Sequence, residues 1–566
     1  MTWYNSTMYD SAPATRTTFL SRFFSKITFD RWHITVLVIA FICALPILSV
    51  LSFVFRPTGE VWQHLADTVL TEYVINSLLL IIGVSFGTLT MGITTAWLTS
   101  VCRFPGRKVF QWMLLLPMAL PAYIIAYTYT GMFDVAGPVQ SGIRTWFDVS
   151  YGEYWFPEIR SVWGATSMLS LVLFPYVYLL ARAAFLEQSV VALEASRSLG
   201  SGLWRSFFQV ALPMARPAII TGLSLVLMET LADFGTVQYF GISTFTTGIF
   251  RTWFGLGDST AAAQLSAILL IFVFFLITIE RLSRKQARYH HVSNREKAYQ
   301  RITLTGKKAW LATSACFLPL FFGFILPVIQ LIVWAIETYE DMVDKEFISL
   351  VMNSLGLAVA AAILALVLAL IMGYGQRLQK TPLIQFAVRV SSLGYAIPAT
   401  VIAVGVMLPM AWLDNTLDSW MRVQFNYSTG LLFSGTLFAL MFAYMVRFLA
   451  VSVGTVEAAL GKIKLSMDDT ARSLGLKPLQ VLTLVHMPIM RRSLITAVLL
   501  VFVDVLKELP ATLILRPFNF NTLAVKAYEL ASDERLADAS TAALSIVLAG
   551  IIPVILLSQS INRGRS

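Results

Sequence analysis

Long apolar runs dominate this chain and restrict it to folds that span a lipid bilayer. Hydrophobic residues make up 57% of the sequence, and charged residues only 13%. A soluble core cannot bury that much apolar surface, whereas a bilayer accommodates it. A spanning helix needs about 20 mostly apolar residues, so the runs predict about twelve transmembrane helices. They lie near 33–55, 73–99, 109–133, 161–184, 216–240, 261–279, 310–336, 350–375, 384–412, 428–449, 492–514 and 539–559.

The charges of the connecting loops predict the orientation of the chain. Basic side chains collect in the N-terminal segment 1–32 and in alternate loops, for example at Arg103, Arg107 and Lys108. The intervening loops are acidic or mixed, as around Glu337. Because Lys and Arg favour the cytoplasmic side, both termini are expected in the cytoplasm. The same rule explains the net charge of +10 without a nucleic-acid partner.

A polar segment interrupts the apolar pattern twice, at residues 193–213 and 468–488. Both copies contain Arg-Ser-Leu-Gly, ending at Gly200 and Gly475, and both place a proline at the same distance beyond, Pro213 and Pro488. Further pairs match at similar offsets: Asn76-Ser77-Leu78 with Asn353-Ser354-Leu355, and Leu120-Pro121-Ala122 with Ile397-Pro398-Ala399. Repeated matches in corresponding places indicate an internal duplication.

The duplication predicts an all-α membrane protein built from two tandem six-helix repeats. The first repeat is expected at 33–280 and the second at 310–566, related by an axis along the membrane normal. A basic linker, 281–309, joins them. A nucleic-acid contact is conceivable for this linker, but a cytoplasmic segment beside anionic lipid is favoured.

Each polar segment is expected to form a short cytoplasmic helix with a charged face. In the first copy, Val190 and Leu193 would face inward, while Glu194 and Arg197 would be exposed. Gly200 suits the left-handed residue that ends a helix. A proline is tolerated in the first turn of a helix, so Pro213 predicts the start of the next one. An ordinary capped loop is the alternative, which the identical spacing of the two copies disfavours.

The polar segments resemble the EAA loops of binding-protein-dependent ABC importer permeases. The first copy matches that pattern at Glu194, Ala195, Gly200, Leu212 and Pro213, and the second at Ala471, Gly475 and Pro488, with Asp469 at the glutamate position. Arg197 and Arg472 lie within the matching stretches. The second copy departs more, with Asp469 for glutamate and Met487 for leucine. The resemblance implies a type I importer-like fold in which these segments dock on two copies of an ABC ATPase subunit.

The chain itself carries no motif for nucleotide, metal or cofactor chemistry. The phosphate-binding pattern G-x-x-x-x-G-K-[ST] does not occur, so ATP would be used by the partner subunit and no cofactor is expected on this chain. The cysteines, Cys43, Cys102 and Cys316, form no C-x-x-C pair, and the histidines are dispersed. We therefore expect a transport protein rather than an enzyme.

Acidic residues recur within two of the predicted spans. Glu229 and Asp233 lie four residues apart, which predicts that they share one helix face. Asp504 and Glu508 occupy the matching positions of the second repeat, with Lys507 beside them. Charged groups inside a membrane cost about 2.5–3.5 kcal/mol each and usually face a bundle interior or an aqueous path. Pairing with neighbouring polar groups is one interpretation; the favoured one is a translocation path for a cation, to which Tyr123, Tyr127 and Tyr129 could add oxygens.

The sequence around these acids is similar to the fused ferric-iron permeases of bacterial ABC importers. The similarity covers residues 30 to 560, including Met228-Glu229-Thr230-Leu231-Ala232-Asp233 and Lys507-Glu508-Leu509-Pro510. It implies that the chain lies in the bacterial inner membrane and that a periplasmic binding protein delivers ferric iron to its outer loops. The same architecture could instead carry thiamine, a polyamine or another small solute. An ion-driven secondary transporter is the alternative from a different class, but it would not require the paired polar segments.

Overall fold

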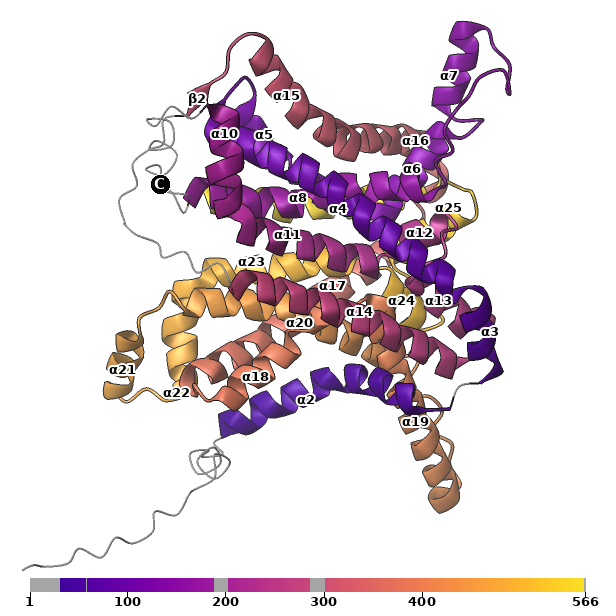
Figure 1. Ribbon diagram of the computed structural model, residues 1–566. Coiled ribbons are helices and arrows are strands. Elements are labelled where there is room, and N and C mark those ends of the chain that lie inside the picture. Colours follow the sequence, from indigo (N-terminus) through magenta and orange to yellow (C-terminus); the bar gives the residue numbers. More distant parts are fainter. Residues whose placement is uncertain (1–30, 58, 188–201, 286–300, 564–566) are drawn as a thin grey trace, which may run out of the picture.

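The computed structural model describes residues 31–57, 59–187, 202–285 and 301–563, and these form an almost entirely helical bundle (Figure 1). The prediction of an all-α protein is confirmed. In the described part, the one sheet is a pair of two-residue parallel strands, β1 (Cys102–Arg103) and β2 (Ile302–Thr303). This pair ties the end of the predicted linker to the first repeat.

Helices of the first repeat follow the predicted apolar runs, with short amphipathic helices between them. They are α2 (Arg31–Ser52), η1 (Phe53–Phe55), α3 (Glu60–Thr68), α4 (Leu70–Val101), α5 (Arg107–Met113), η2 (Leu116–Ala119), α6 (Ala122–Phe133), α7 (Pro138–Phe147), α8 (Val162–Glu187), α10 (Leu203–Ser206), η3 (Phe207–Ala211), α11 (Leu212–Ala232), α12 (Gly235–Tyr239), α13 (Phe245–Phe250), η4 (Arg251–Gly255) and α14 (Ser259–Lys285).

The second repeat runs through a corresponding series. It comprises α15 (Lys307–Leu320), η5 (Phe321–Ile325), α16 (Leu326–Met342), α17 (Lys345–Leu378), α18 (Pro382–Ser391), η6 (Gly394–Ala396), α19 (Ala399–Phe425), α20 (Leu437–Leu460), α21 (Leu465–Ser473), α22 (Pro478–Gln480), η7 (Val481–His486), α23 (Met487–Leu506), α24 (Pro510–Leu515), α25 (Leu523–Ser532) and α26 (Ala539–Arg563).

Ten of the predicted spans coincide with helices that are long and apolar enough to cross a membrane. Within the described residues there are 9 such helices, or up to 10 when the bent pair Arg107–Ala119 and Ala122–Phe147 counts as one. The eleventh and twelfth runs fall short of that measure. Helix α23 carries Arg491, Arg492 and Asp504, and the apolar part of α26 is the shorter stretch Ala539–Pro553.

The third and ninth predicted spans are broken at the repeated proline motifs. Pro121 and Pro398 both adopt extended backbone, with ψ of 142° and 139°, immediately before α6 and α19. In the first repeat the two parts of the span meet at 90°. Proline disfavours helical backbone in the residue before it, so each motif ends a 3-10 turn and redirects the chain. The duplicated sequence therefore produces a duplicated break.

The predicted helix start at Pro213 is wrong in one respect, because the chain is already helical before it. A π-helical turn, η3, leads directly into α11, and η7 leads in the same way into α23 at Pro488. A proline has no N–H to donate and its ring crowds the carbonyl four residues earlier. A wider π turn accommodates both defects, so the helix continues through the proline.

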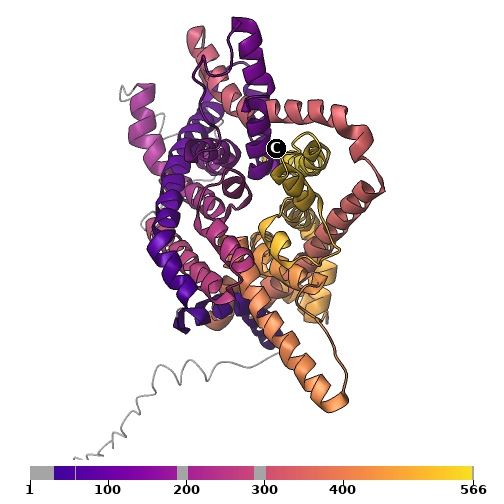
Figure 2. The same ribbon diagram turned by 90° about the vertical axis from the view of Figure 1, so that its right-hand side faces the viewer.

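The two repeats are interleaved. Helix α2 packs on α18 and α19 of the second repeat, while α16 packs on α6 of the first and on α26 (Figure 1). Figure 1 shows α2 along the lower edge of the bundle, and Figure 2 shows α15–α16 on its periphery. The inner helices α4, α8 and α11 form one bundle and α17, α20 and α23 form another. The residues where these bundles face each other are the ones that hold the intramembrane acids.

The short helices divide between the two ends of the bundle. Helices α10, α21 and α22 lie at one end, on the left of Figure 1. Helices α3 and α7 and the C-terminal part of α19 lie at the opposite end. The second polar segment is thus separated along the bundle from the loops predicted to face outward.

Candidate functional site: a charged central cavity and a pinned surface helix

A cavity of about 130 Å³ lies between the two repeats and is lined by all four predicted acids and by Lys507. Its charged lining residues are Glu229, Asp233, Arg447, Asp504, Lys507 and Glu508. Aromatic residues Tyr123, Tyr176 and Tyr395 line it as well. The four carboxylates that the sequence placed in two separate spans thus surround one space.

The prediction that Glu229 and Asp233 share one helix face is wrong. Helix α11 ends at Ala232, and Asp233 has extended backbone with ψ of 130°. Its carboxylate accepts hydrogen bonds from the Thr236 hydroxyl at 2.9 Å and the Val237 N–H at 3.1 Å. These are first-turn groups of α12, whose free N–H groups attract an anion, and this contact stops the predicted span 216–240 early.

The second repeat repeats this arrangement. Helix α23 ends at Leu506, before Glu508, so Asp504 and Glu508 do not share a helix either and the predicted span 492–514 is broken. Glu508 accepts from the N–H groups of Ala511 at 2.9 Å and Thr512 at 3.0 Å, and so caps α24. Asp233 and Glu508 are therefore equivalent caps at the broken ends of equivalent helices.

The remaining acids differ between the repeats. Asp504 forms an ion pair with Lys507, with 2.9 Å between Oδ1 and Nζ, and Glu508 lies 3.7 Å from Nη1 of Arg447. The Glu229 carboxylate has no hydrogen bond or ion pair among the described residues, and its interaction with Lys507 is a longer-range electrostatic one. Pairing, the alternative interpretation, thus applies to the second repeat, whereas the first repeat presents an unpaired carboxylate.

Of the three tyrosines proposed as oxygen donors, only Tyr123 lines the cavity. Tyr127 is fully buried, and the Tyr129 hydroxyl donates to the carbonyl of Phe322 at 2.6 Å. No group of three or more His, Cys, Asp or Glu side chains that could hold a metal ion occurs within the described ranges. The carboxylates are therefore distributed around the cavity and do not form a cluster that could chelate a metal ion.

The part of the first polar segment that includes Glu194, Ala195, Arg197 and Gly200, residues 193–201, lies outside the described residues. Leu212 and Pro213 are described and form the first turn of α11. The second segment is described throughout, and its residues Asp469, Ala471 and Arg472 lie on α21. Pro488 stands in the first turn of α23.

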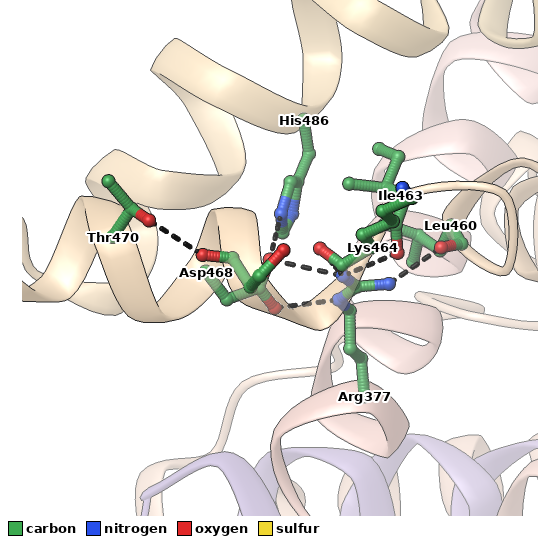
Figure 3. Close-up of polar contacts among 8 residues, drawn as sticks. Arg377, Leu460, Ile463, Lys464, Asp468, Thr470 and His486 are labelled. Atoms are coloured by element: carbon green, nitrogen blue, oxygen red, sulfur yellow. Dashed lines mark hydrogen bonds and ion pairs between the residues drawn. The ribbon is translucent and has the colours of Figure 1, made fainter.

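Helix α21 is attached to the bundle through Asp468 (Figure 3). Arg377 of α17 donates from Nε and Nη2 to the two carboxylate oxygens of Asp468, at 2.7 and 3.0 Å. His486 bonds the same carboxylate through Nε2 at 2.8 Å. Burial alone would raise the pKa of Asp468, but the hydrogen bonds from Arg377 and His486 outweigh it and hold that pKa below its usual range.

The same arginine also secures the end of α20. It donates from Nη1 to the carbonyl of Leu460 at 2.6 Å and from Nη2 to that of Ile463 at 2.9 Å. A cation is favoured at a helix C-terminus, where the last carbonyls lack partners. Arg377 and Asp468 are both more than nine-tenths buried, so this contact holds three elements together out of water.

Gly475 ends α21 in the left-handed conformation, with φ of +85°. The N–H of Gly475 donates to the carbonyl of Arg472, and the N–H of Leu476 donates to the carbonyl of Ala471. These two hydrogen bonds form a Schellman motif. The cap expected at Gly200 lies outside the described residues, and Gly475 is its counterpart in the second copy. On the outward side, Asp469, Arg472 and Leu474 are exposed, Leu474 by 79%. The helix thus presents a mixed charged and apolar surface.

Sequence reasoning missed the partners of these residues. Arg377 and His486 are far from Asp468 in sequence. Arg447 and Tyr395 lie in apolar runs, where no sequence pattern indicated which residues they contact. A charged residue within a spanning helix is costly, so Arg377 and Arg447 could have been flagged on that ground. Their specific partners depend on how the repeats pack.

Comparison with known proteins agrees with this architecture. Residues 88–288 match the family described as "Binding-protein-dependent transport system inner membrane component". Over 495 residues the chain is 28% identical to "Fe(3+)-transport system permease protein FbpB 2" of Haemophilus influenzae, covering 87% of this chain and 90% of that protein.

Shorter relatives match part of the chain. "Molybdenum transport system permease protein ModB" of Escherichia coli is 29% identical over 240 residues, which are 41% of this chain but 98% of that protein. "Sulfate transport system permease protein CysT" of Escherichia coli is 25% identical over 203 residues, 35% of this chain and 70% of that protein. A nearly complete relative thus fits within less than half of the chain, as a fusion of two permease units predicts.

Proteins of this family are transport permeases, which implies a periplasmic binding protein and an ATPase as partners. The apolar helices and the interleaved repeats agree with a multi-pass protein of the inner membrane. The chain is thus similar to the binding-protein-dependent transport permeases over residues 88–288, and to an Fe(3+)-transport permease protein over 87% of its length.

Proposed function

We propose that the chain is the permease of a ferric-iron ABC importer. A periplasmic binding protein delivers the ion to the end of the bundle that carries α3 and α7. The ion passes between the repeats, and two copies of a separate ATPase subunit supply the energy. No cofactor is bound to this chain, and both termini lie in the cytoplasm.

The charge of the central cavity carries this proposal. Its lining has four carboxylates against the two cations Arg447 and Lys507, so its formal charge is negative when all six are ionised. Sulfate and molybdate are anions that such a lining repels, whereas a cation is attracted. The cavity therefore favours Fe(3+), the substrate named for the Haemophilus influenzae relative, over the molybdenum and sulfate named for the two shorter relatives.

The second polar segment supplies the surface for the ATPase. Helix α21 exposes Asp469, Arg472 and Leu474 and is fixed to α17 through Asp468. A helix that is rigidly attached transmits the movement of a bound partner to the bundle, whereas a mobile loop would absorb it. Two such segments would receive the closure of two ATPase subunits and swing the repeats between inward and outward access.

Uptake measurements test the proposal. Cells lacking this gene should regain uptake of radiolabelled ferric iron when the chain is restored, and uptake of labelled molybdate and sulfate should stay unchanged. Restored molybdate or sulfate uptake without iron uptake would contradict the assignment. Competition by excess thiamine or spermidine provides a test for an organic cation as the substrate.

A further inference from the structure

The two repeats contribute unequal charge to the central cavity. The second repeat lines it with Asp504 and Glu508 and also with Lys507 and Arg447. The first repeat lines it with Glu229 and Asp233 and no cation. The position of Lys507 corresponds to Ala232 in the first repeat. The residues of α8 that line the cavity are also uncharged: Leu169, Val172, Leu173 and Tyr176. The symmetry of the backbone is thus not matched by the charges.

Lys507 is placed to act on both repeats. Its ammonium is 2.9 Å from Asp504, and it also interacts electrostatically with Glu229 of the opposite repeat. Tyr176 and Tyr395, one from each repeat, lie beside the same two carboxylates. The ammonium therefore occupies a position between the acids of the two repeats, the position that a cation passing between them would need.

Arg447 belongs to the same lining but is held differently. Its Nε and Nη1 are buried without a hydrogen-bond partner among the described residues, although Nη1 lies 3.7 Å from Glu508. Glu508 already uses its oxygens to cap α24. Asp233 likewise caps α12. Of the four carboxylates in the lining, Glu229 and Asp504 are thus the two that do not cap a helix.

We propose that Lys507 is a tethered counter-cation that determines how tightly the cavity holds its cargo. It neutralises Asp504 when the cavity is empty and is displaced when a cation passes. A path must bind its ion strongly enough to admit it and weakly enough to release it. Without Lys507, a trivalent ion would meet one more uncompensated carboxylate and would be retained. This inference rests on the proposed function, because it assumes a cationic cargo.

Retention of ferric iron by the purified permease–ATPase complex in lipid nanodiscs tests the inference. Radiolabelled ferric citrate is added, unbound label is removed by gel filtration, and retained label is counted. Lys507→Met should retain at least about tenfold more iron than the wild type, since even 1.4 kcal/mol of added attraction gives that factor. Its rate of iron uptake in cells should fall.

Three variants separate charge from other effects. Lys507→Arg preserves the charge and should retain iron as the wild type does. Asp504→Asn/Lys507→Met restores the charge balance and avoids an unpaired acid, so its retention should return close to the wild-type value even if Lys507→Met folds poorly. Lys526→Met removes an ammonium that pairs with Glu346 at 3.1 Å outside the cavity and should change nothing.

The outcomes distinguish this inference from the proposed function. Equal iron retention by the wild type and Lys507→Met overturns the role of Lys507, as does high retention by the charge-balanced double variant. Absence of iron uptake by wild-type cells overturns the proposed function, whatever the retention shows. Labelled molybdate should be retained by none of these proteins, and its retention by the wild type would contradict a cation-binding cavity.

Discussion

Replacing Arg377 with methionine should detach the surface helix α21 from the membrane bundle. The substitution keeps an apolar stem but removes both hydrogen bonds to Asp468 and those to the carbonyls of Leu460 and Ile463. Breaking a buried ion pair by removing one partner costs about 3–5 kcal/mol, because the other charge stays buried. His486 still contacts Asp468, so the lower part of that range is expected.

Amide hydrogen exchange measures this effect locally. A cost of about 3 kcal/mol increases the open population of α21 by a factor on the order of 100, so its amides should exchange that much faster. The diagnostic amides are those of Leu474, Gly475 and Leu476, which close the end of the helix. Amides of α4 should be unaffected, since α4 is remote from the contact.

Arg422→Met serves as the matched control. Arg422 pairs with Asp418 at 2.6 Å but is 62% exposed, and such pairs contribute only about 0–1 kcal/mol. The control should exchange and transport as the wild type does. In Arg377→Met, ATP hydrolysis by the partner should persist while uptake falls. Unchanged exchange in α21 together with unchanged uptake would refute the reasoning that this contact holds the helix.

Four further predictions follow from individual contacts. Gly475→Val places a β-branched residue at a φ of +85°, so it should destabilise the end of α21 by about 1–2 kcal/mol and lower uptake. Gly454→Ala is the control, because a Cβ at this position of α20 meets open space. Thermal unfolding and transport are measured for both variants. Folding lowers the pKa of Asp468, so the ionised carboxylate contributes its full stabilisation at neutral pH. That stabilisation is lost as the pH falls from about 3.9, the pKa in the unfolded chain, through the lower pKa in the folded protein. Asp468→Asn should abolish this part of the acid dependence of Tm. Glu229→Gln with Asp504→Asn should lower iron transport while ATPase binding persists, and unchanged transport would favour a purely structural role for these acids. Asp233→Ala should instead lower the melting temperature, because removing a helix cap costs about 0.5–2 kcal/mol.

Much of the fold followed from hydropathy and duplication. The apolar runs located ten spans because a bilayer imposes both length and composition on a helix. The repeated Leu-Pro-Ala and Ile-Pro-Ala motifs marked positions where the chain breaks, but the break itself was not predicted. A run of apolar residues looks continuous in sequence even where one proline divides it.

The charged sites were predictable as residues but not as geometry. Glu229 and Asp233 were expected on one helix face, yet Asp233 is taken up by the first turn of α12 and ends the helix. Helix periodicity assumes that the helix continues, and a capping carboxylate is what makes it stop. The ion pairs of Glu508 and Asp468 join residues tens of positions apart, so they follow from the packing of α20 and α17 rather than from local pattern.

Transport by the reconstituted system tests the central claim most directly. The chain, its ATPase and its iron-loaded binding protein are assembled in proteoliposomes, and the movement of radiolabelled ferric iron is followed with and without ATP. We predict ATP-dependent accumulation that is lost when the binding protein is omitted and is insensitive to collapse of a proton gradient. Accumulation driven by a proton gradient in the absence of ATP would contradict the account.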